Sequence, residues 1–212
     1  MIQPTISSEI ILASGSPRRS ELLKKYGVEF YVFVPQVDEL ADCADLRALP
    51  CMNAELKAAA AAEIFPDKII IAADTVIFFN NSVIGKPHDP DDAIRILQLF
   101  AGREHEVITG CAVICRKLGL KYVFRDTSYV KFKPLDRVKI SDYIGKVNVL
   151  DKAGAYAVQE YGDDIIEKYT GSLENIIGLP ELFSGQEDIS LINTGDETAV
   201  FSWIKSLKQR YD

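Results

Sequence analysis

The sequence predicts a mixed α/β fold, and two segments indicate it most directly. A short apolar run at residues 10–13 leads at once into a helical pattern, and residues 68–79, KIIIAADTVIFF, are apolar almost throughout. A run of the second kind is typical of a central strand that is buried on both faces. Helical and strand patterns alternate along the rest of the 212 residues. We therefore expect one α/β domain with two lobes around a central cleft.

The first helix is predicted to begin at residue 16 with an anion site. Ser16 suits the N-cap, a proline follows at the first helical position, and Gly27 ends the helix. Arg18 and Arg19 occupy the first turn, where basic side chains oppose the helix dipole. A bound anion would explain them, because the free N–H groups of a helix start and two guanidinium groups all bind phosphate. The alternative is that Arg18 and Arg19 are ordinary solvated residues that bind no anion.

The remaining elements follow from apolar periodicity and from residues that start or end helices. Residues 29–37 alternate as a strand, and the alanine-rich residues 53–65 are strongly helical. The later expectations, in chain order, are a turn at 80–81, a helix at 89–100, paired strands at 104–117 and 121–133, a helix at 134–145, strands at 151–159 and 165–169, a loop or helix start at 174–180, and an amphipathic helix at 196–211.

Composition excludes several classes of function. The net charge of −7 argues against a nucleic-acid surface and leaves phosphate binding to a local basic cluster. No apolar run approaches the ~20 residues of a membrane span, and the opening residues, MIQPTISSEI, lack a signal-peptide pattern. The 4 cysteines do not have the spacing of a metal site and are expected to be free, buried thiols. We therefore expect a cytoplasmic protein.

Asp74 is the most distinctive polar residue, because it interrupts the long apolar run together with Thr75. A buried carboxylate is costly unless it meets a cation or hydrogen-bond donors. Asp74 is thus a candidate metal ligand or general base at the end of a central strand, with a loop-capping role as the alternative. Glu39 is the natural second carboxylate, unless it is a solvated loop residue. Two carboxylates suit Mg²⁺ or Mn²⁺, which prefer oxygen ligands and substrate phosphates.

Three lysines could complete a phosphate-binding set. Lys57 lies on the alanine-rich helix, where a solvated lysine is the simpler interpretation. Lys86 is presented by a Gly-Lys-Pro loop, and Lys152 has a similar setting before Ala-Gly. Together with Arg18 and Arg19 they would supply five cations, enough to neutralise a triphosphate.

The common nucleotide and hydrolase motifs are absent from the sequence. There is neither a GxxxxGK[ST] loop nor a GxGxxG fingerprint. Ser14 and Ser16 do not form a GxSxG elbow, so we interpret them as a phosphate-contacting hydroxyl and a helix cap. His88 and His105 lack a partner pattern for nucleophile activation and are expected to be structural.

In their order, the motifs closely resemble the Maf family of nucleoside triphosphate pyrophosphatases. The matching pieces run from about residue 10 to residue 180 and include a lysine at position 57: LASGSPRRSELL, VDE, IAADTVI, GKP, TG, DKAGAYAVQ and NIIGLP. The resemblance implies a mixed α/β fold similar to that of the inosine triphosphate pyrophosphatases, with a cleft between two lobes. It leaves a C-terminal tail, residues 183–212, unmatched.

The resemblance also implies an activity, the hydrolysis of a nucleoside triphosphate to its monophosphate and pyrophosphate. A divalent cation, Mg²⁺ or Mn²⁺, would assist, and the enzyme would usually be a homodimer. Carried onto this chain, the residues expected to act in catalysis are Glu39, Lys57, Asp74 and Lys86, with Glu39 and Asp74 holding the metal. The residues expected to contact substrate are Ser14, Ser16, Arg18, Arg19, Thr75, Lys152 and Gln159.

Gln159 bears on the choice of base. DKAG followed by this glutamine resembles the family branch that acts on dTTP and UTP, and an amide suits the thymine or uracil edge because it donates and accepts. The family usually has glycine next, whereas Glu160 follows here. A pyrophosphatase for purine triphosphates such as ITP, and a nucleotide-sensing regulator of cell division without catalysis, are the alternatives.

Overall fold

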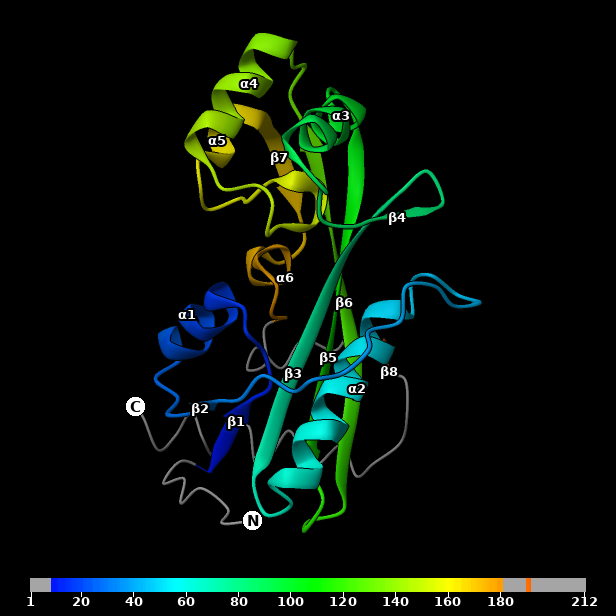
Figure 1. Ribbon diagram of the computed structural model, residues 1–212, viewed down its shortest axis with the longest axis vertical. Coiled ribbons are helices and arrows are strands. Elements are labelled where there is room, and N and C mark those ends of the chain that lie inside the picture. The colour runs from blue at the N-terminus through cyan, green and yellow to red at the C-terminus, as the bar shows by residue number, and fades with distance from the viewer. Residues whose placement is uncertain (1–8, 181–189, 192–212) are drawn as a thin grey trace. The chain divides into compact units, whose positions relative to one another are not determined.

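A computed structural model describes residues 9–180 and 190–191 (Figure 1). The helices and strands are, in chain order, β1 (Ile10–Leu12), α1 (Pro17–Lys25), β2 (Tyr31–Val32), α2 (Leu49–Ile64), β3 (Ile69–Phe79), β4 (Ser82–Ile84), α3 (Pro90–Phe100), β5 (Glu104–Cys115), β6 (Leu120–Phe132), α4 (Arg137–Lys146), the short 3₁₀ helix η1 (Ala153–Ala155), α5 (Gly162–Ile165), β7 (Ile166–Thr170), α6 (Leu173–Ile177) and β8 (Ser190–Leu191).

The strands form a mixed sheet, which confirms the predicted α/β class. Its order is β2-β1-β3-β5-β6-β7, with β4 beside β3 and β8 beside β6. Strand β1 is parallel to both of its neighbours, whereas β4, β7 and β8 pair antiparallel with their partners. The long apolar run is β3, which lies between β1 and β5 as expected of a central strand.

The chain divides into two compact units. Unit 1 holds the chain up to Asp74, Thr109–Asp126 and the chain from Gly178, and unit 2 holds Thr75–Ile108 and Thr127–Ile177. Strands β3, β5 and β6 contribute residues to both units. The expectation of a single domain over residues 1–212 stays a prediction.

The core of unit 1 is built on the alanine face of α2. Ala58, Ala61 and Ala62 are completely buried and pack with apolar residues of β1, β3, β5 and β6. Small side chains let the helix lie close to the strands. Gly110 of β5 allows the closest approach, since a Cβ there would lie 2.3 Å from the backbone nitrogen of Cys51. Helix α2 begins at Leu49, before the predicted residue 53, with Ala48 at its N-cap and no capping side chain to signal the start.

The core of unit 2 gathers the apolar faces of α3 and α4 with a cluster of aromatic rings. Helix α3 is capped as expected, because the Asp89 carboxylate accepts a hydrogen bond from the Asp92 N–H. His105 is buried against Phe100, and its Nε2 lies 2.8 Å from the hydroxyl of Tyr156. This is the structural role expected of that histidine.

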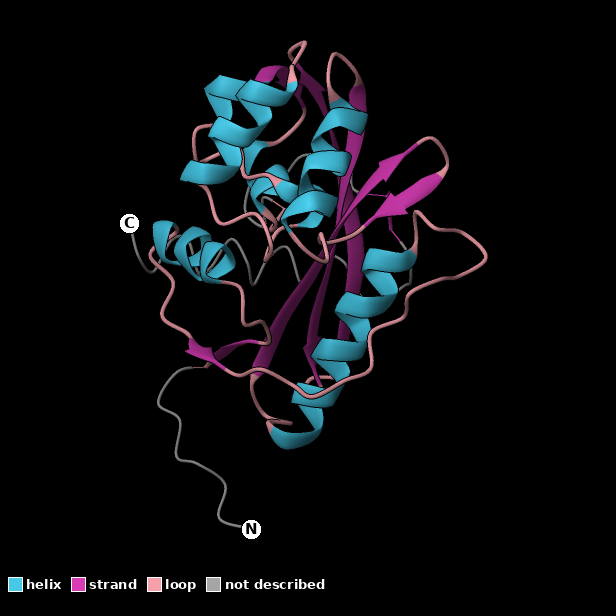
Figure 2. Cartoon of the chain, turned by 45° about the horizontal axis from the view of Figure 1, so that its top comes forward, coloured by secondary structure: helices cyan, strands magenta, loops and turns pink. Residues whose placement is uncertain are grey.

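Two strand predictions need correction. Residues 151–159 contain η1, and Gly154 and Ala155 have φ angles of 71° and 61°, which a strand does not adopt. Residues 154–157 of this turn are buried in succession, whereas a strand with one solvated face would bury every second residue. Within residues 29–37, only β2 is a strand, and residues 33–48 carry no helix or strand (Figure 2).

The predictions for the C-terminal helix, the cysteines and membrane spans have separate outcomes. The helix predicted at 196–211 lies outside the described residues. All four cysteines are free, three of them buried and Cys43 partly exposed. Among the described helices, none combines the length and the apolar character needed to cross a membrane.

Candidate active site

The site in unit 1 forms where β1 ends beside β3. Leu12 pairs with Ile71, and the Ala13 N–H donates to the Ile71 carbonyl at 2.7 Å. Ser14 follows the end of β1, and Asp74 follows Ile71 on the parallel strand β3. Both residues therefore lie past the same end of the paired region. Ligands in α/β folds bind at such an end. Asp74 was expected at a strand end, but β3 continues to Phe79 and it is β1 that ends here.

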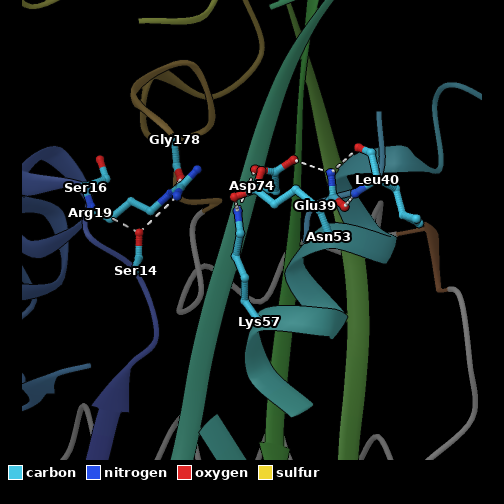
Figure 3. Close-up of polar contacts among 9 residues, drawn as sticks. All are labelled: Ser14, Ser16, Arg19, Glu39, Leu40, Asn53, Lys57, Asp74 and Gly178. Carbon is cyan, nitrogen blue, oxygen red and sulfur yellow. Dashed lines mark hydrogen bonds and ion pairs between the residues drawn. The ribbon is translucent and has the colours of Figure 1, made fainter. Parts of the chain in front are cut away.

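Lys57 joins the two predicted carboxylates. Its Nζ lies 2.8 Å from Asp74 Oδ1 and 3.0 Å from Glu39 Oε1. Figure 3 shows the lysine reaching from α2 toward both acids. The Lys57 and Asp74 side chains are 11% and 14% exposed, whereas that of Glu39 is 52% exposed. The Lys57–Asp74 pair is therefore largely shielded from solvent, whereas Glu39 is accessible to it.

Asn53 lies one helical turn before Lys57, on the same face of α2. Its amide Nδ2 donates to Asp74 Oδ2 at 3.3 Å and to the Leu40 carbonyl at 3.1 Å, and its Oδ1 accepts from the Leu40 N–H at 2.8 Å. Asn53 is not among the residues predicted from the sequence. Its position four residues before the candidate lysine was the available signal, since side chains at that spacing on a helix are neighbours.

Arg19 connects α1 to the turn that precedes it. Its Nη1 donates to Ser14 Oγ at 3.0 Å, and its Nε donates to the Gly178 carbonyl at 2.7 Å (Figure 3). Burial lowers the pKa of the Arg19 guanidinium, an effect that the negative charge of Asp74 opposes. Arginine is the most basic side chain, so the group stays a cation at neutral pH. Arg18 is half-buried in the same first turn.

Ser16 occupies the N-cap position of α1 but does not cap it with its side chain. Its backbone N–H instead donates to Ser14 Oγ at 3.2 Å. The capping hydrogen bond expected of Ser16 is therefore wrong, and Ser14 takes the organising role because its hydroxyl oxygen accepts from both Ser16 and Arg19.

The other predicted residues belong to unit 2. Lys86 is exposed in the loop after β4, Gln159 is exposed after η1, and Thr75 is half-buried on β3. Lys152 is 4% exposed, and protein oxygens surround its ammonium. Its Nζ lies 2.6 Å from the Asn148 carbonyl, 2.9 Å from Asp151 Oδ1 and 3.3 Å from Glu160 Oε1.

A divalent cation can be tested against the acids of unit 1. No group of three or more His, Cys, Asp or Glu residues that could hold a metal occurs in the described part of the chain. Glu39 and Asp74, however, both reach the Lys57 ammonium and so converge on a common point. Two carboxylates with phosphate oxygens and water form a normal ligand set for Mg²⁺. The donor set therefore fits Mg²⁺ or Mn²⁺ bound together with a phosphate substrate.

Most of the chain is similar to known proteins. Residues 9–183 match the family model described as "Maf-like protein". A "dTTP/UTP pyrophosphatase" of Akkermansia muciniphila is 41% identical over 172 residues, which cover 81% of this chain and 90% of the relative. A protein of the same name from Syntrophus aciditrophicus is 38% identical over 197 residues, which cover 91% of this chain and 96% of the relative.

Among solved structures, the Staphylococcus aureus Ham1 protein is similar with a TM-score of 0.44 and 17% identity, covering 58% of this chain and 71% of that protein. The family assignment depends instead on the match over residues 9–183 and on the identities to the curated relatives. The chain belongs to the Maf-like protein family.

Proposed function

We propose that this chain is a nucleoside triphosphate pyrophosphatase that converts dTTP and UTP to the nucleoside monophosphate and pyrophosphate. The relatives named dTTP/UTP pyrophosphatase support the reaction class, because the shared region spans 81% of this chain or more. The observation that carries the proposal is the Lys57 ammonium held between Glu39 and Asp74, beside the start of α1.

The start of α1 would bind the triphosphate. It offers the partial positive charge of a helix N-terminus, the half-buried Arg18 and Arg19, and the serines of the preceding turn. Lys57 and Lys86 would add positive charge. These cations would stabilise the negative charge that develops on the pyrophosphate leaving group, since electrostatic stabilisation is a large part of phosphoryl-transfer catalysis.

Asp74 would act on the water nucleophile. Its carboxylate would take a proton from water as the water oxygen forms a bond to the α-phosphorus. The bond from the α-phosphorus to the bridging oxygen then breaks, and its electron pair leaves with pyrophosphate. Lys57 and Asn53 each hold one oxygen of Asp74, which fixes the direction of the carboxylate.

Glu39 and Asp74 would also hold the divalent cation. When bound, Mg²⁺ or Mn²⁺ would neutralise phosphate charge and make water a better nucleophile. Both carboxylates bind Lys57 Nζ, so the lysine would share its partners with the metal.

Gln159, Thr75 and Lys152 complete the proposed substrate contacts in unit 2. Gln159 would bond the base edge, where an amide can both donate and accept. The Lys152 ammonium already has three protein acceptors, so we propose that it acts on substrate mainly by fixing the turn that carries Gln159. We further propose that the enzyme is a homodimer, as the resemblance implies, and that it acts in the cytoplasm.

The test is pyrophosphate release from dTTP, UTP, CTP, ITP, GTP and 7-methyl-GTP with Mg²⁺ or Mn²⁺, on wild type and on Asp74→Asn. We expect dTTP and UTP to be the preferred substrates and the variant to lose at least ~10³-fold in kcat, because both the base and a metal ligand are altered. Preference for ITP or 7-methyl-GTP would overturn the assignment of Gln159. Binding without turnover of any nucleotide would overturn the enzyme itself.

A further inference from the structure

Asn53 is the point at which three parts of unit 1 meet. It lies on α2 and is 3% exposed. Its side chain bonds to both backbone groups of Leu40, in the segment before α2, and to Asp74 Oδ2 on β3. One amide therefore ties a helix, an irregular segment and a central strand together (Figure 3).

The segment that carries Glu39 needs such an anchor. Residues 33–48 contain no helix or strand, so no sheet or helical ladder fixes their backbone. The Phe33 N–H donates to the Leu12 carbonyl at 3.0 Å, and the next backbone hydrogen bonds along the described chain are those of Leu40 with Asn53. Leu40 directly follows Glu39, so the anchor fixes the residue beside the exposed carboxylate.

The chemistry of the position requires an amide. An asparagine can accept from the Leu40 N–H while it donates to the Leu40 carbonyl and to Asp74. An aspartate of the same shape could keep only the first bond and would place its charge against Asp74. A leucine of similar size would keep none of the three. Buried polar groups that lose their partners are costly, so each replacement has a distinct structural consequence.

From these contacts we infer that Asn53 is a positioning residue, which sets the separation of Glu39 and Asp74 and so prepares the pair to bind a divalent cation. In the proposed mechanism it contacts neither the phosphates nor the attacking water. Asn53 is expected to affect turnover by positioning the two acids, and this part of the inference rests on the proposed function. Its hydrogen bonds to Leu40 are independent of the proposed function.

The first measurement is hydrogen exchange of the Leu40 amide in the protein without substrate. Asn53→Leu removes the acceptor of that amide, so its exchange should become at least ~10-fold faster than in wild type. Asn53→Asp keeps the acceptor and should stay near the wild-type rate. Unchanged protection in Asn53→Leu would overturn the anchor, and this result is independent of any activity. If Asn53→Leu does not fold, Asn53→Ala takes its place, since it also removes the acceptor of the Leu40 amide, and unchanged protection in that variant would overturn the anchor.

The second measurement is the Mn²⁺ concentration that gives half-maximal pyrophosphate release from dTTP. Replacing a residue that orients metal ligands typically lowers metal affinity or activity by ~10–100-fold. We expect Asn53→Leu to raise the half-saturating Mn²⁺ concentration by ~10-fold or more, with a smaller loss of kcat at saturating Mn²⁺. A normal Mn²⁺ requirement together with fast Leu40 exchange would overturn the positioning role.

The matched control is Asn175→Leu. Asn175 is also a fully buried asparagine, and its Nδ2 donates to the Val107 carbonyl at 3.0 Å and to Ser128 Oγ at 2.8 Å within unit 2. This variant should lose stability through the same kind of buried polar defect, yet keep the wild-type Mn²⁺ requirement. An equal shift in both variants would assign the effect to lost stability and overturn the inference. A wild type that hydrolyses no nucleotide refutes the proposed function, while the exchange result still decides the anchor.

Discussion

Two lysines in this chain each bind two carboxylates, and their surroundings differ. Lys57 in unit 1 pairs with Glu39 and Asp74, and the Asp74 contact joins residues 17 positions apart. Lys152 in unit 2 binds Asp151 and the Asn148 carbonyl, which are 1 and 4 positions away, and then Glu160. The first lysine joins distant segments of the chain, whereas the second closes a local turn.

The two ammonium groups also differ in how fully they are bound. Three protein oxygens surround Lys152, one for each N–H. Two carboxylates bind Lys57, and among the described residues no third acceptor contacts it. Similar ion clusters can thus serve different purposes. The Lys57 ammonium can still bind a phosphate oxygen, whereas the fully bound Lys152 ammonium stabilises a turn.

Among the variants that test this comparison of two lysines, Lys57→Met is expected to give the largest effect. Removing the cation between two acids should lower kcat/KM for dTTP by ~10²–10³-fold, because a positive charge near the phosphates and the orientation of Asp74 are lost together. Steady-state pyrophosphate release measures this directly. Activity within a few fold of wild type would make Lys57 a purely structural residue and would remove the distinction between the two clusters.

Lys152→Met is expected to act on stability instead. The ammonium is buried, but Asp151 and Glu160 are 51% and 43% exposed, so water can solvate them after the change. We therefore expect a loss of ~1–3 kcal/mol in the free energy of unfolding, from broken charged hydrogen bonds, measured by urea denaturation. Turnover of dTTP should fall less than ~10-fold.

Glu160→Gln is the companion variant to Lys152→Met. It keeps a hydrogen-bond acceptor for Lys152 and removes one charge, so its loss of stability should be the smaller of the two. A loss of activity in Lys152→Met as large as that of Lys57→Met would show that Lys152 contacts phosphate directly, and would contradict the comparison.

The sequence allowed part of the Lys57 cluster to be predicted, for a physical reason. Asp74 stands out because a carboxylate inside an apolar run needs a partner, whereas the pattern around Lys57 favoured a solvated lysine and only the family resemblance gave it a role. Both are also parts of the family motif series, which the family match confirms. The long strand β3 and the capped helix α3 were predictable from local signals alone.

The remaining features depended on tertiary contacts. Asn53 is defined by Leu40 and Asp74, which no local pattern links to it. The turn at 151–159 was predicted as a strand from its sequence pattern, but residues 154–157 are buried in succession, and the positive φ angles of Gly154 and Ala155 cannot be read from that pattern. Ser16 was expected to cap α1, but Ser14 accepts its N–H because the turn folds back on itself.

His105 should give the smallest effect on turnover and a clear effect on acid stability. Burial lowers the pKa of its imidazole to about 3, against about 6.5 in an unfolded chain. Below pH 6.5 the unfolded chain takes up a proton that the folded protein does not. The free energy of unfolding should therefore decrease as the pH falls from 6.5 toward 3, by about 2 kcal/mol at pH 5 from this group alone.

His105→Gln isolates that contribution. Glutamine does not titrate, and its amide can still bond the hydroxyl of Tyr156, the partner of His105 in the core of unit 2. Carboxylates that contribute to acid sensitivity are shared by both proteins, so their effect cancels in the comparison. Urea denaturation at pH 7.5 and pH 5 should show wild type losing about 2 kcal/mol more than the variant. Equal losses would mean that His105 is protonated in the folded protein, and that the aromatic cluster around it opens at mildly acidic pH.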